Sequence, residues 1–384
     1  MFHGTSQSGA TRTLKAATEQ HRCPQETDHS VAGGADPFLW GRTREARPLA
    51  QRRLTTPLDP DPLFVSEFER FPRQFDPVYS QFLQGNIRDR VLRERVLYAV
   101  GLSGFRERAF LVRVSSDLCG LDWERTLPLA IAAECFIASA LTADDVLDRA
   151  SVRWWQPTVW VHWGDGQAWL VAEMLHALAH SAATGVHPCA EGIFRAAVRR
   201  VFEGQSQQSL AEPPWSTQQV LRLAFRRTGS LIQACVEAPA LIAASGFRAS
   251  LKCYGKAFGI ALQIADDIYD FVGSPEVLGK PILGDLLNGQ PNFLLAHALS
   301  QADSPAKEQI THSFLRGVTD SPSDPAPIVD ALRELGSIDF AERLVTRYAI
   351  RGRNALKSIP EGPPRILLEG LLDLALALPE KYDH

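Results

Sequence analysis

The sequence predicts an all-α fold, a single large helical bundle that follows a disordered N-terminal extension. Three observations support this. From about residue 75 onward the apolar residues recur at helical spacing, no convincing run of strand-like alternation is present, and Pro- and Gly-bearing stretches separate the helical segments. With 384 residues, 45% of them hydrophobic and 22% charged, the chain can bury a sizeable core. Length alone would allow two domains, but the continuity of the pattern favours one.

The first 60 residues differ in composition from the rest. They are rich in Gly, Ser, Thr, Pro and Arg and show little periodicity, so we expect the range 1–60 to be disordered. They lack the continuous apolar segment of a secretory signal, although their Ser and Thr content leaves a transit peptide open. The bundle domain is therefore expected at 75–384.

The helices are predicted in chain order from the apolar spacing and from the breakers between them. The separators read GVHP, AEPPWS, GSPEVLGKP, DSPSDPAP and IPEGPP. The stretch at 127–143 is the longest apolar one, but it carries Glu134 and runs into aspartates, so we interpret it as a buried core helix and expect no transmembrane segment. The predicted helices lie near 88–118, 124–149, 164–183, 191–206, 217–244, 248–273, 290–301, 327–357 and 364–379.

Charge and cysteine content exclude several classes of function. The net charge of -4 and a pI near 6.2 do not show the excess of positive charge that is typical of nucleic-acid-binding proteins. No Lys/Arg block follows an apolar span, as it would in a sequence that binds a membrane surface. The six cysteines are scattered, without a C-x-x-C pair, so neither a zinc site nor a disulfide framework is implied. We therefore expect a cytoplasmic protein.

Two aspartate clusters stand in otherwise apolar helical segments. Residues four apart share a helix face, so each D-D-x-x-D gathers carboxylates in one direction. Ionised carboxylates beside a core are unfavourable unless a cation compensates them. Hard oxygen ligands in this number favour Mg²⁺ that shares its coordination with substrate phosphates. The clusters comprise Asp144, Asp145 and Asp148 in LTADDVLD, and Asp266, Asp267 and Asp270 in IALQIADDIYDF.

These two motifs, with FRRTGSLIQA between them and GSPEVLGKPILGDLLNGQPNFLLAHAL after them, resemble the trans-isoprenyl diphosphate synthase (polyprenyl synthetase) family over roughly residues 85–380. The resemblance implies an isoprenoid-synthase bundle in which the two motifs face each other and hold three Mg²⁺ on an allylic isoprenyl diphosphate. It also implies that the metal cluster removes diphosphate and leaves a carbocation. A homodimer is implied by the resemblance alone.

The resemblance supplies a nearly complete allylic half of the site. All six aspartates are expected to serve the metal ions, Asp270 through water. Arg153 matches the first arginine after the first motif, Arg227 and Thr228 stand where the family has a Lys-Thr pair, Lys280 in LGKP matches a second lysine, and Gln263 precedes the second motif.

The half that binds isopentenyl diphosphate (IPP) departs from the family pattern. In SGFRERA, Phe105 replaces a lysine while Arg106 and Arg108 are kept; Ile137 stands for a histidine; and Trp154 and Trp155 replace the arginine and glycine that follow Arg153. Each lost charge-assisted contact to phosphate costs about 1.5–3 kcal/mol. The sequence therefore predicts weakened IPP binding.

Aromatic side chains at these positions suggest a different acceptor. Their faces stabilise a nearby cation by about 0.5–2 kcal/mol each, and a dry pocket protects a carbocation from water. In the family that the chain resembles, bulky residues just before the first motif close the pocket below a short product, so the small Ser139 and Ala140 are expected to admit a long prenyl tail. Phe136, one turn further down, is then expected to close the pocket at C15 or C20. The alternative is that these aromatic residues have no role in catalysis and only pack within the loop.

Three functional hypotheses remain. The preferred one is an Mg²⁺-dependent enzyme that ionises an allylic prenyl diphosphate and cyclises it or transfers it to a non-IPP acceptor, as terpene synthases and some prenyltransferases do. The second is a conventional chain-elongating synthase of the farnesyl or geranylgeranyl type that uses IPP. The third is a non-catalytic regulatory subunit, against which the retained aspartates, Arg227 and Lys280 speak.

Overall fold

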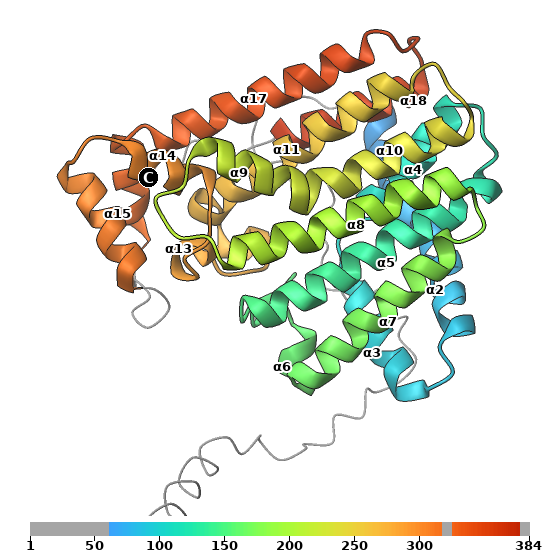
Figure 1. The fold of residues 1–384 in the computed structure, drawn as a ribbon, viewed down its shortest axis with the longest axis horizontal. Helices are drawn as coiled ribbons and strands as arrows, with labels where there is room; N and C mark the ends of the chain where they lie inside the picture. Colours follow the sequence, from blue (N-terminus) through green and yellow to red (C-terminus); the bar gives the residue numbers. More distant parts are fainter. Residues whose placement is uncertain (1–60, 317–324, 377–384) are drawn as a thin grey trace, which may run out of the picture. The chain divides into compact units, whose positions relative to one another are not determined.

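The computed structural model describes residues 61–316 and 325–376, which all belong to one compact unit. These residues form a bundle of helices (Figure 1), as the sequence predicts, and the expected disorder of 1–60 lies outside the described residues. The helices are α2 (Pro62–Asn86), α3 (Arg90–Gly101), α4 (Glu107–Leu118), α5 (Trp123–Leu147), α6 (Val159–Trp163), α7 (Asp165–Ala183), α8 (Pro188–Ser209), α9 (Thr217–Ala224), η2 (Phe225–Gly229), α10 (Ser230–Ile242), α11 (Arg248–Val272), α12 (Pro275–Leu278), α13 (Gly284–Leu287), α14 (Phe293–Ser300), α15 (Pro305–Arg316), α16 (Ala326–Glu334), α17 (Ser337–Leu356) and α18 (Pro363–Leu376).

The centre of the bundle is built from the two helices that carry the aspartates. Helix α5 packs along α7 and α4, and α11 packs along α10 and α17, while α10 also contacts α8 and α4 (Figure 1). Buried small residues allow the close approach: a Cβ placed on Gly259 would lie 2.4 Å from the Cα of Gly229, so α11 and η2 touch backbone to backbone. Both aspartate motifs therefore lie on elements locked into one core.

Several predicted boundaries are corrected. The segment 88–118 is two helices, because the chain reverses at 102–106, where Arg106 adopts a left-handed φ of 67°. The segment 327–357 breaks at Gly336, which has φ 67°. The bundle begins at Pro62, earlier than the predicted residue 75, because four phenylalanines of α2 lie in the core with its other apolar residues. The short α6 and the helix α15 were not predicted.

A two-stranded hairpin follows the first aspartate cluster. Strand β1 (Val152–Arg153) pairs antiparallel with β2 (Gln156–Pro157), and Trp154 and Trp155 form the turn with φ of 51° and 61°. Asn and Gly are the usual residues in such a left-handed turn, and bulky side chains there cost about 1–2 kcal/mol each. Strain of this kind is often retained where it serves a site.

One described helix, α5, is long and apolar enough to cross a membrane, and 72% of its apolar window is buried inside the bundle. Its apolar character matches the prediction of a core helix, because its buried residues include Ala132, Ala133 and Cys135.

Candidate functional site

The first aspartate cluster ends helix α5. Asp144 and Asp145 lie in its last turn, and Asp148 is its C-terminal cap. Asp145 is buried and accepts two hydrogen bonds from the Arg153 guanidinium, with Nη2 at 2.7 Å and Nε at 3.0 Å from Oδ1. The hairpin that carries the tryptophans is therefore tied to the cluster through its own arginine.

A π-helical turn brings Arg227 to the same cluster. The turn η2 interrupts the α-helical path between α9 and α10, and such turns are frequent at functional sites. Arg227 Nη2 lies 3.3 Å from Asp144 Oδ1, and its Nε donates to Gln205 at 2.8 Å. Gln205 in turn donates to Asp144 at 2.6 Å. A Cβ on Gly204 would meet Arg226 and Arg227 at about 3 Å, so glycine is needed for this approach.

The second cluster ends helix α11. Asp267 is buried and accepts from Gln263 and from the backbone N–H of Phe293, each at 2.9 Å. The Thr228 hydroxyl donates to Gln263 at 2.6 Å, which links the π-turn to this cluster as well. Asp266 is exposed and lies 3.7 Å from the Lys280 ammonium.

Asp270 has a structural partner in the segment that follows α11. Its two carboxylate oxygens accept the N–H groups of Gly284 and Asp285 at 3.2 and 3.0 Å. These N–H groups begin the short helix α13, so Asp270 fixes that turn against α11.

One polar chain joins the two clusters. Gln290 Nε2 donates to Asp148 at 2.5 Å and accepts from Gln208 at 2.6 Å, and Gln208 also accepts from Arg227. The backbone N–H of Gln290 donates to the Asp285 carbonyl at 2.7 Å, and the Asp285 N–H in turn donates to Asp270 of the second cluster at 3.0 Å. The segment after α11 therefore reaches the end of α5, and the two motifs share one site although more than a hundred residues separate them.

Several carboxylates in this site strongly favour protonation. Burial and the neighbouring Asp144 raise the pKa of Asp148 to about 7. Burial and Asp285 raise the pKa of Asp270 to about 8, and the same two causes raise the pKa of Asp267. Such shifts arise where burial removes carboxylates from water and other carboxylates lie close by.

The donor set fits Mg²⁺. Carboxylate and amide oxygens are the ligands that a hard divalent cation prefers, and the crowded negative charge is what such a cation relieves. Among the described residues, no group of three His, Cys, Asp or Glu side chains is placed to hold a metal ion. Asp144, Asp145 and Asp267 each accept hydrogen bonds from protein donors in this arrangement.

The aromatic side chains form a contiguous wall beside the clusters. The rings of Phe105 and Trp154 meet edge to face with centroids 5.4 Å apart, and Trp154 and Trp155 follow at 6.2 Å. The N–H of Trp155 donates to the Gly279 carbonyl at 2.9 Å, one residue before Lys280. Gly279 is left-handed at φ 65°, and a Cβ there would meet Trp155 at 2.8 Å. The wall thus connects the hairpin after the first motif to the turn after the second.

The structure corrects the expectation that Arg106 lines the substrate pocket. Its side chain is 1% exposed, with Nε 2.8 Å from Asp76 Oδ1, Nη1 2.8 Å from the Ser103 hydroxyl and Nη1 3.6 Å from Glu134. These groups occupy the guanidinium in the core, so Arg106 holds the α3–α4 loop in place. Arg108 is half-buried, and its Nε has no hydrogen-bond partner in the described residues.

The candidate tail residues lie on α5 one to two turns before the first cluster. Ser139 is buried and Ala140 is partly exposed, as is Ile137, the residue at the predicted IPP-binding histidine position. Phe136 is buried against the rings of His176 and His180 on α7, with centroids 5.5 and 5.1 Å away. Whether Phe136 closes the pocket stays a prediction.

The sequence reasoning missed several polar residues of the site. Asp285 is a seventh carboxylate whose oxygen accepts from Asn292 at 2.7 Å, and burial raises its pKa. Gln205 and Gln208 were missed because they carry no charge pattern and lie on α8, which the sequence gives no reason to place beside the aspartates.

Comparison with known proteins agrees with this geometry. The family described as Polyprenyl synthetase matches residues 89–330. Geranylfarnesyl diphosphate synthase of Aeropyrum pernix is 31% identical, covering 72% of this chain and 91% of its own. Heptaprenyl diphosphate synthase component 2 of Geobacillus stearothermophilus is 30% identical, covering 74% and 88%. A polyprenyl synthase of Caulobacter crescentus, crystallised with calcium and isoprenyl diphosphate, shares the fold with a TM-score of 0.75 and 24% identity, covering 81% of this chain and 97% of that one.

Proposed function

The chain belongs to the polyprenyl synthetase family, and on that premise we propose that it is an Mg²⁺-dependent prenyltransferase that ionises an allylic prenyl diphosphate and elongates it with IPP. The names of the relatives favour chain elongation over the cyclase hypothesis that the sequence alone placed first. The proposal includes the cytoplasmic location and the homodimer expected from the sequence.

The observation that carries the proposal is the joining of both aspartate clusters in one polar network with three cations at its edge. Arg153 contacts Asp145, Arg227 contacts Asp144 and Lys280 contacts Asp266. An anion that entered this site with Mg²⁺ would compete for the same cations. Arginine and lysine placed around a diphosphate are suited to stabilise its negative charge as the leaving group departs.

Bound Mg²⁺ supplies Lewis-acid stabilisation of the departing diphosphate. The chain's own residues orient that diphosphate: Arg227 and Thr228 from the π-turn on one side, and Lys280 from the turn after α11 on the other. Gln263 holds Asp267 through its amide at 2.9 Å and so fixes one carboxylate of the second cluster. Phe105 and Trp154 offer aromatic faces beside the cationic fragment.

A second candidate function has its own supporting observation. The positions expected to hold IPP phosphate are occupied by the aromatic wall, and Arg106 is engaged in the core. This arrangement favours ionisation followed by cyclisation or by transfer to a non-IPP acceptor. Under either candidate the same clusters perform the first step.

Product analysis separates the two candidates. Purified protein with Mg²⁺ is incubated with geranyl, farnesyl or geranylgeranyl diphosphate, with and without IPP, and products are identified by mass spectrometry. Longer prenyl diphosphates that appear only with IPP support elongation. A hydrocarbon or terpene alcohol formed without IPP rejects elongation in favour of the second candidate. No turnover with any substrate, alone or with IPP, would contradict elongation and cyclisation and would favour either transfer to an acceptor that the assay lacks or a regulatory subunit.

A paired variant tests the acceptor half directly. Phe105→Lys with Trp154→Arg restores two cations at positions of the aromatic wall and is expected to lower the KM for IPP by about 10-fold or more if phosphate contacts were lost there. Trp169→Arg, on the exposed face of α7, is the matched control and should leave that KM unchanged. A KM that does not fall in the paired variant would show that IPP, if used, binds elsewhere.

A further inference from the structure

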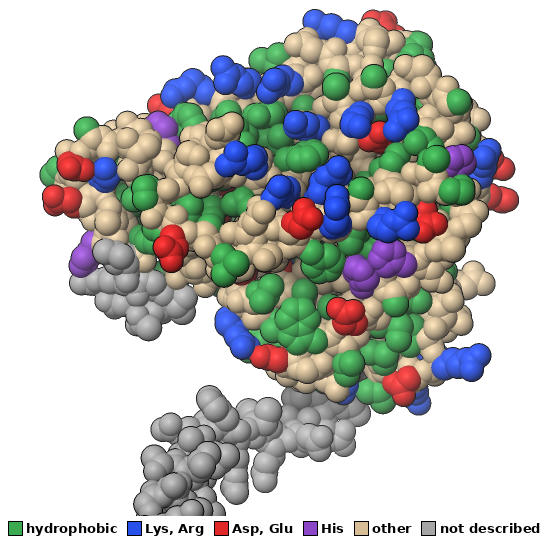
Figure 2. Space-filling view, viewed as in Figure 1, with side chains coloured by type: hydrophobic (Ala, Val, Ile, Leu, Met, Phe, Trp, Pro, Cys, Tyr) green, Lys and Arg blue, Asp and Glu red, His purple; other side chains and the backbone are tan. Residues whose placement is uncertain are grey.

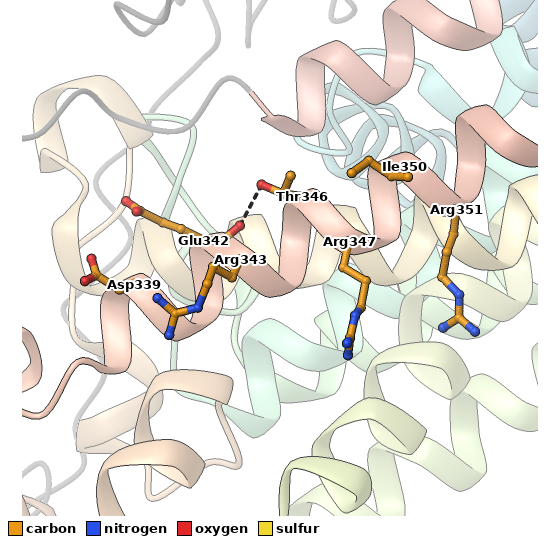
Figure 3. A pocket seen from close by; sticks show the side chains of 7 residues that line it. All are labelled: Asp339, Glu342, Arg343, Thr346, Arg347, Ile350 and Arg351. Atoms are coloured by element: carbon orange, nitrogen blue, oxygen red, sulfur yellow. Dashed lines mark hydrogen bonds between the residues drawn. The ribbon is translucent and has the colours of Figure 1, made fainter.

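A stripe of arginines runs along the exposed face of α17, apart from the aspartate clusters. Arg343, Arg347 and Arg351 are four residues apart and therefore share one helix face. All three are exposed and line a pocket with Ile350 and Thr346 (Figure 3). No carboxylate of the described residues lies within salt-bridge distance of any of them, and Arg351 stacks over the Tyr348 ring at 5.4 Å.

A second basic stripe with the same spacing lies on α11. Arg248, Lys252 and Lys256 are exposed and again four residues apart. The hydroxyls of Ser250 and Ser358 are 2.7 Å apart, so the start of α11 lies beside the end of α17 and the two packed helices run antiparallel. The stripes therefore extend along neighbouring helices of one surface.

The surface carries an excess of positive charge although the whole chain is at -4. Arg248 and Lys252 share one carboxylate, Glu237, whose side chain is 4% exposed. Lys256 forms no ion pair with any residue in the described part of the chain and lies 5.1 Å from the centre of the Phe225 ring. Figure 2 shows Lys and Arg side chains gathered over this face. Asp339 and Glu342 stand only at the N-terminal end of α17.

We propose that this face, defined as Arg343, Arg347 and Arg351 of α17 with Arg248, Lys252 and Lys256 of α11, docks on the surface of an anionic lipid bilayer. Basic side chains near an anionic bilayer are each attracted to its negative surface potential. Ile350, which is 51% exposed on the adjoining stripe, can insert at the level of the headgroups, and long arginine stems can follow it.

The spacing of the charges favours a bilayer over a single small anion. Successive arginines of one stripe stand about 6 Å apart along the helix axis and do not converge on one point. A lattice of lipid phosphates can meet all six cations at once, whereas one free phosphate cannot. The inference is independent of the acceptor used in the reaction, because none of these residues contacts the aspartate clusters.

Vesicle sedimentation with the full chain tests the proposal. Vesicles contain phosphatidylcholine alone or with about 30% phosphatidylglycerol, in about 0.1 M salt. We expect binding only to the anionic vesicles, and loss of about 100-fold in partitioning when Arg343, Arg347 and Arg351 are all changed to Gln. The variant with all three changed to Lys should bind like the wild type.

The matched control removes three charges elsewhere. Arg70→Gln, Arg90→Gln and Arg113→Gln alter two exposed arginines of α2 and α3 and a partly exposed one of α4, and they change the net charge equally. Retained binding in this control supports a defined face. Equal loss in both triple variants, equal binding to neutral vesicles, displacement by millimolar inorganic phosphate, or binding to DNA without binding to anionic vesicles would each overturn the proposal.

Discussion

The fold raises the pKa values of Asp148 and Asp270 into the neutral range. Burial raises both pKa values, and a neighbouring carboxylate adds to the effect, Asp144 for Asp148 and Asp285 for Asp270. At neutral pH the metal-free site is therefore a source of instability that a divalent cation can remove. Sites that bind a charged ligand commonly lower the stability of the ligand-free protein in this way.

The raised pKa of Asp148 predicts how stability changes with pH. Between its ordinary value of 3.8 and about 7, the metal-free folded state binds more protons at this residue than the unfolded state does. The contribution of Asp148 to the free energy of unfolding is therefore fully present below about pH 4 and is lost as the pH rises through about 7. Asp148→Asn should flatten this decline and raise the melting temperature of the metal-free protein at pH 8 by about 2 °C or more.

Thermal unfolding in EDTA from pH 5 to pH 8 measures the effect of Asp148→Asn. Asp339→Asn, an exposed carboxylate of α17, is the control and should follow the wild type. A wild-type decline that persists unchanged in Asp148→Asn would show that this residue is not its origin.

Removal of one carboxylate from each cluster tests the metal assignment. Asp144→Asn and Asp266→Asn should each lower turnover of the allylic diphosphate by roughly 10²–10³-fold or more, because each removes a charged oxygen from the site that stabilises the leaving group. Asp117→Asn on the exposed face of α4 provides the comparison. Wild-type rates in either cluster variant would refute the assignment.

At the level of elements, the loop between α3 and α4 and the hairpin β1–β2 form one wall of the site. The loop is fixed by Arg106, which bonds to α2 through Asp76 and approaches α5 through Glu134. The hairpin is fixed by the Trp155 N–H to Gly279 and by Arg153 to Asp145. The aromatic rings belong to the loop and the hairpin, but contacts with α2, α5 and the turn at Gly279 fix the positions of both segments.

Arg106→Met should destabilise the protein strongly. It leaves the buried carboxylates of Asp76 and Glu134 without the guanidinium that lies near both, for which the typical cost is about 3–5 kcal/mol. Urea unfolding measures the change, and Arg70→Met, in an exposed pair, should cost less than about 1 kcal/mol. If Arg106→Met matches this control, the core network contributes little. Addition of Glu134→Gln to Arg106→Met should recover part of the loss, because it removes one of the buried charges.

Gly279→Ala should detach the hairpin from the turn that carries Lys280. The added Cβ lies 2.9 Å from the backbone of Trp154, and alanine is strained at φ 65°. We expect a shift in tryptophan fluorescence and a higher KM for the allylic diphosphate. Gly185→Ala, equally left-handed at φ 85° but with open space around it, shares the strain without the clash. Equal effects in both variants would contradict a role for the contact.

For the whole molecule, the site links the C-terminal ends of α5 and α11 with the segment after α11 and with η2. Ligands that bind this junction should stabilise the entire bundle, because binding only to the folded state adds to its stability. Mg²⁺ with inorganic diphosphate at about 100 times its Kd adds about 2.7 kcal/mol, or roughly 5 °C in melting temperature. Diphosphate in EDTA should add much less, and an equal shift there would exclude a metal-mediated site.

The sequence by itself determined the all-α fold, because helical spacing of apolar residues is a local property. It also identified both aspartate clusters, whose D-D-x-x-D spacing directs the carboxylates to one helix face. It placed Arg153, Arg227, Lys280 and Gln263 through resemblance, and the structure brings each of them into contact with one of the clusters or with its neighbour.

Only the tertiary structure decided which residues face the site and which support it. Arg106 lies in the core because α2 supplies Asp76, thirty residues earlier in the chain. Gln205, Gln208 and Asp285 enter the site because α8 packs on α10 and η2 and the segment after α11 folds back toward the end of α5. The two basic stripes become one surface only when α11 and α17 lie antiparallel. Such neighbours depend on packing between distant segments, and a one-dimensional pattern carries no record of that packing.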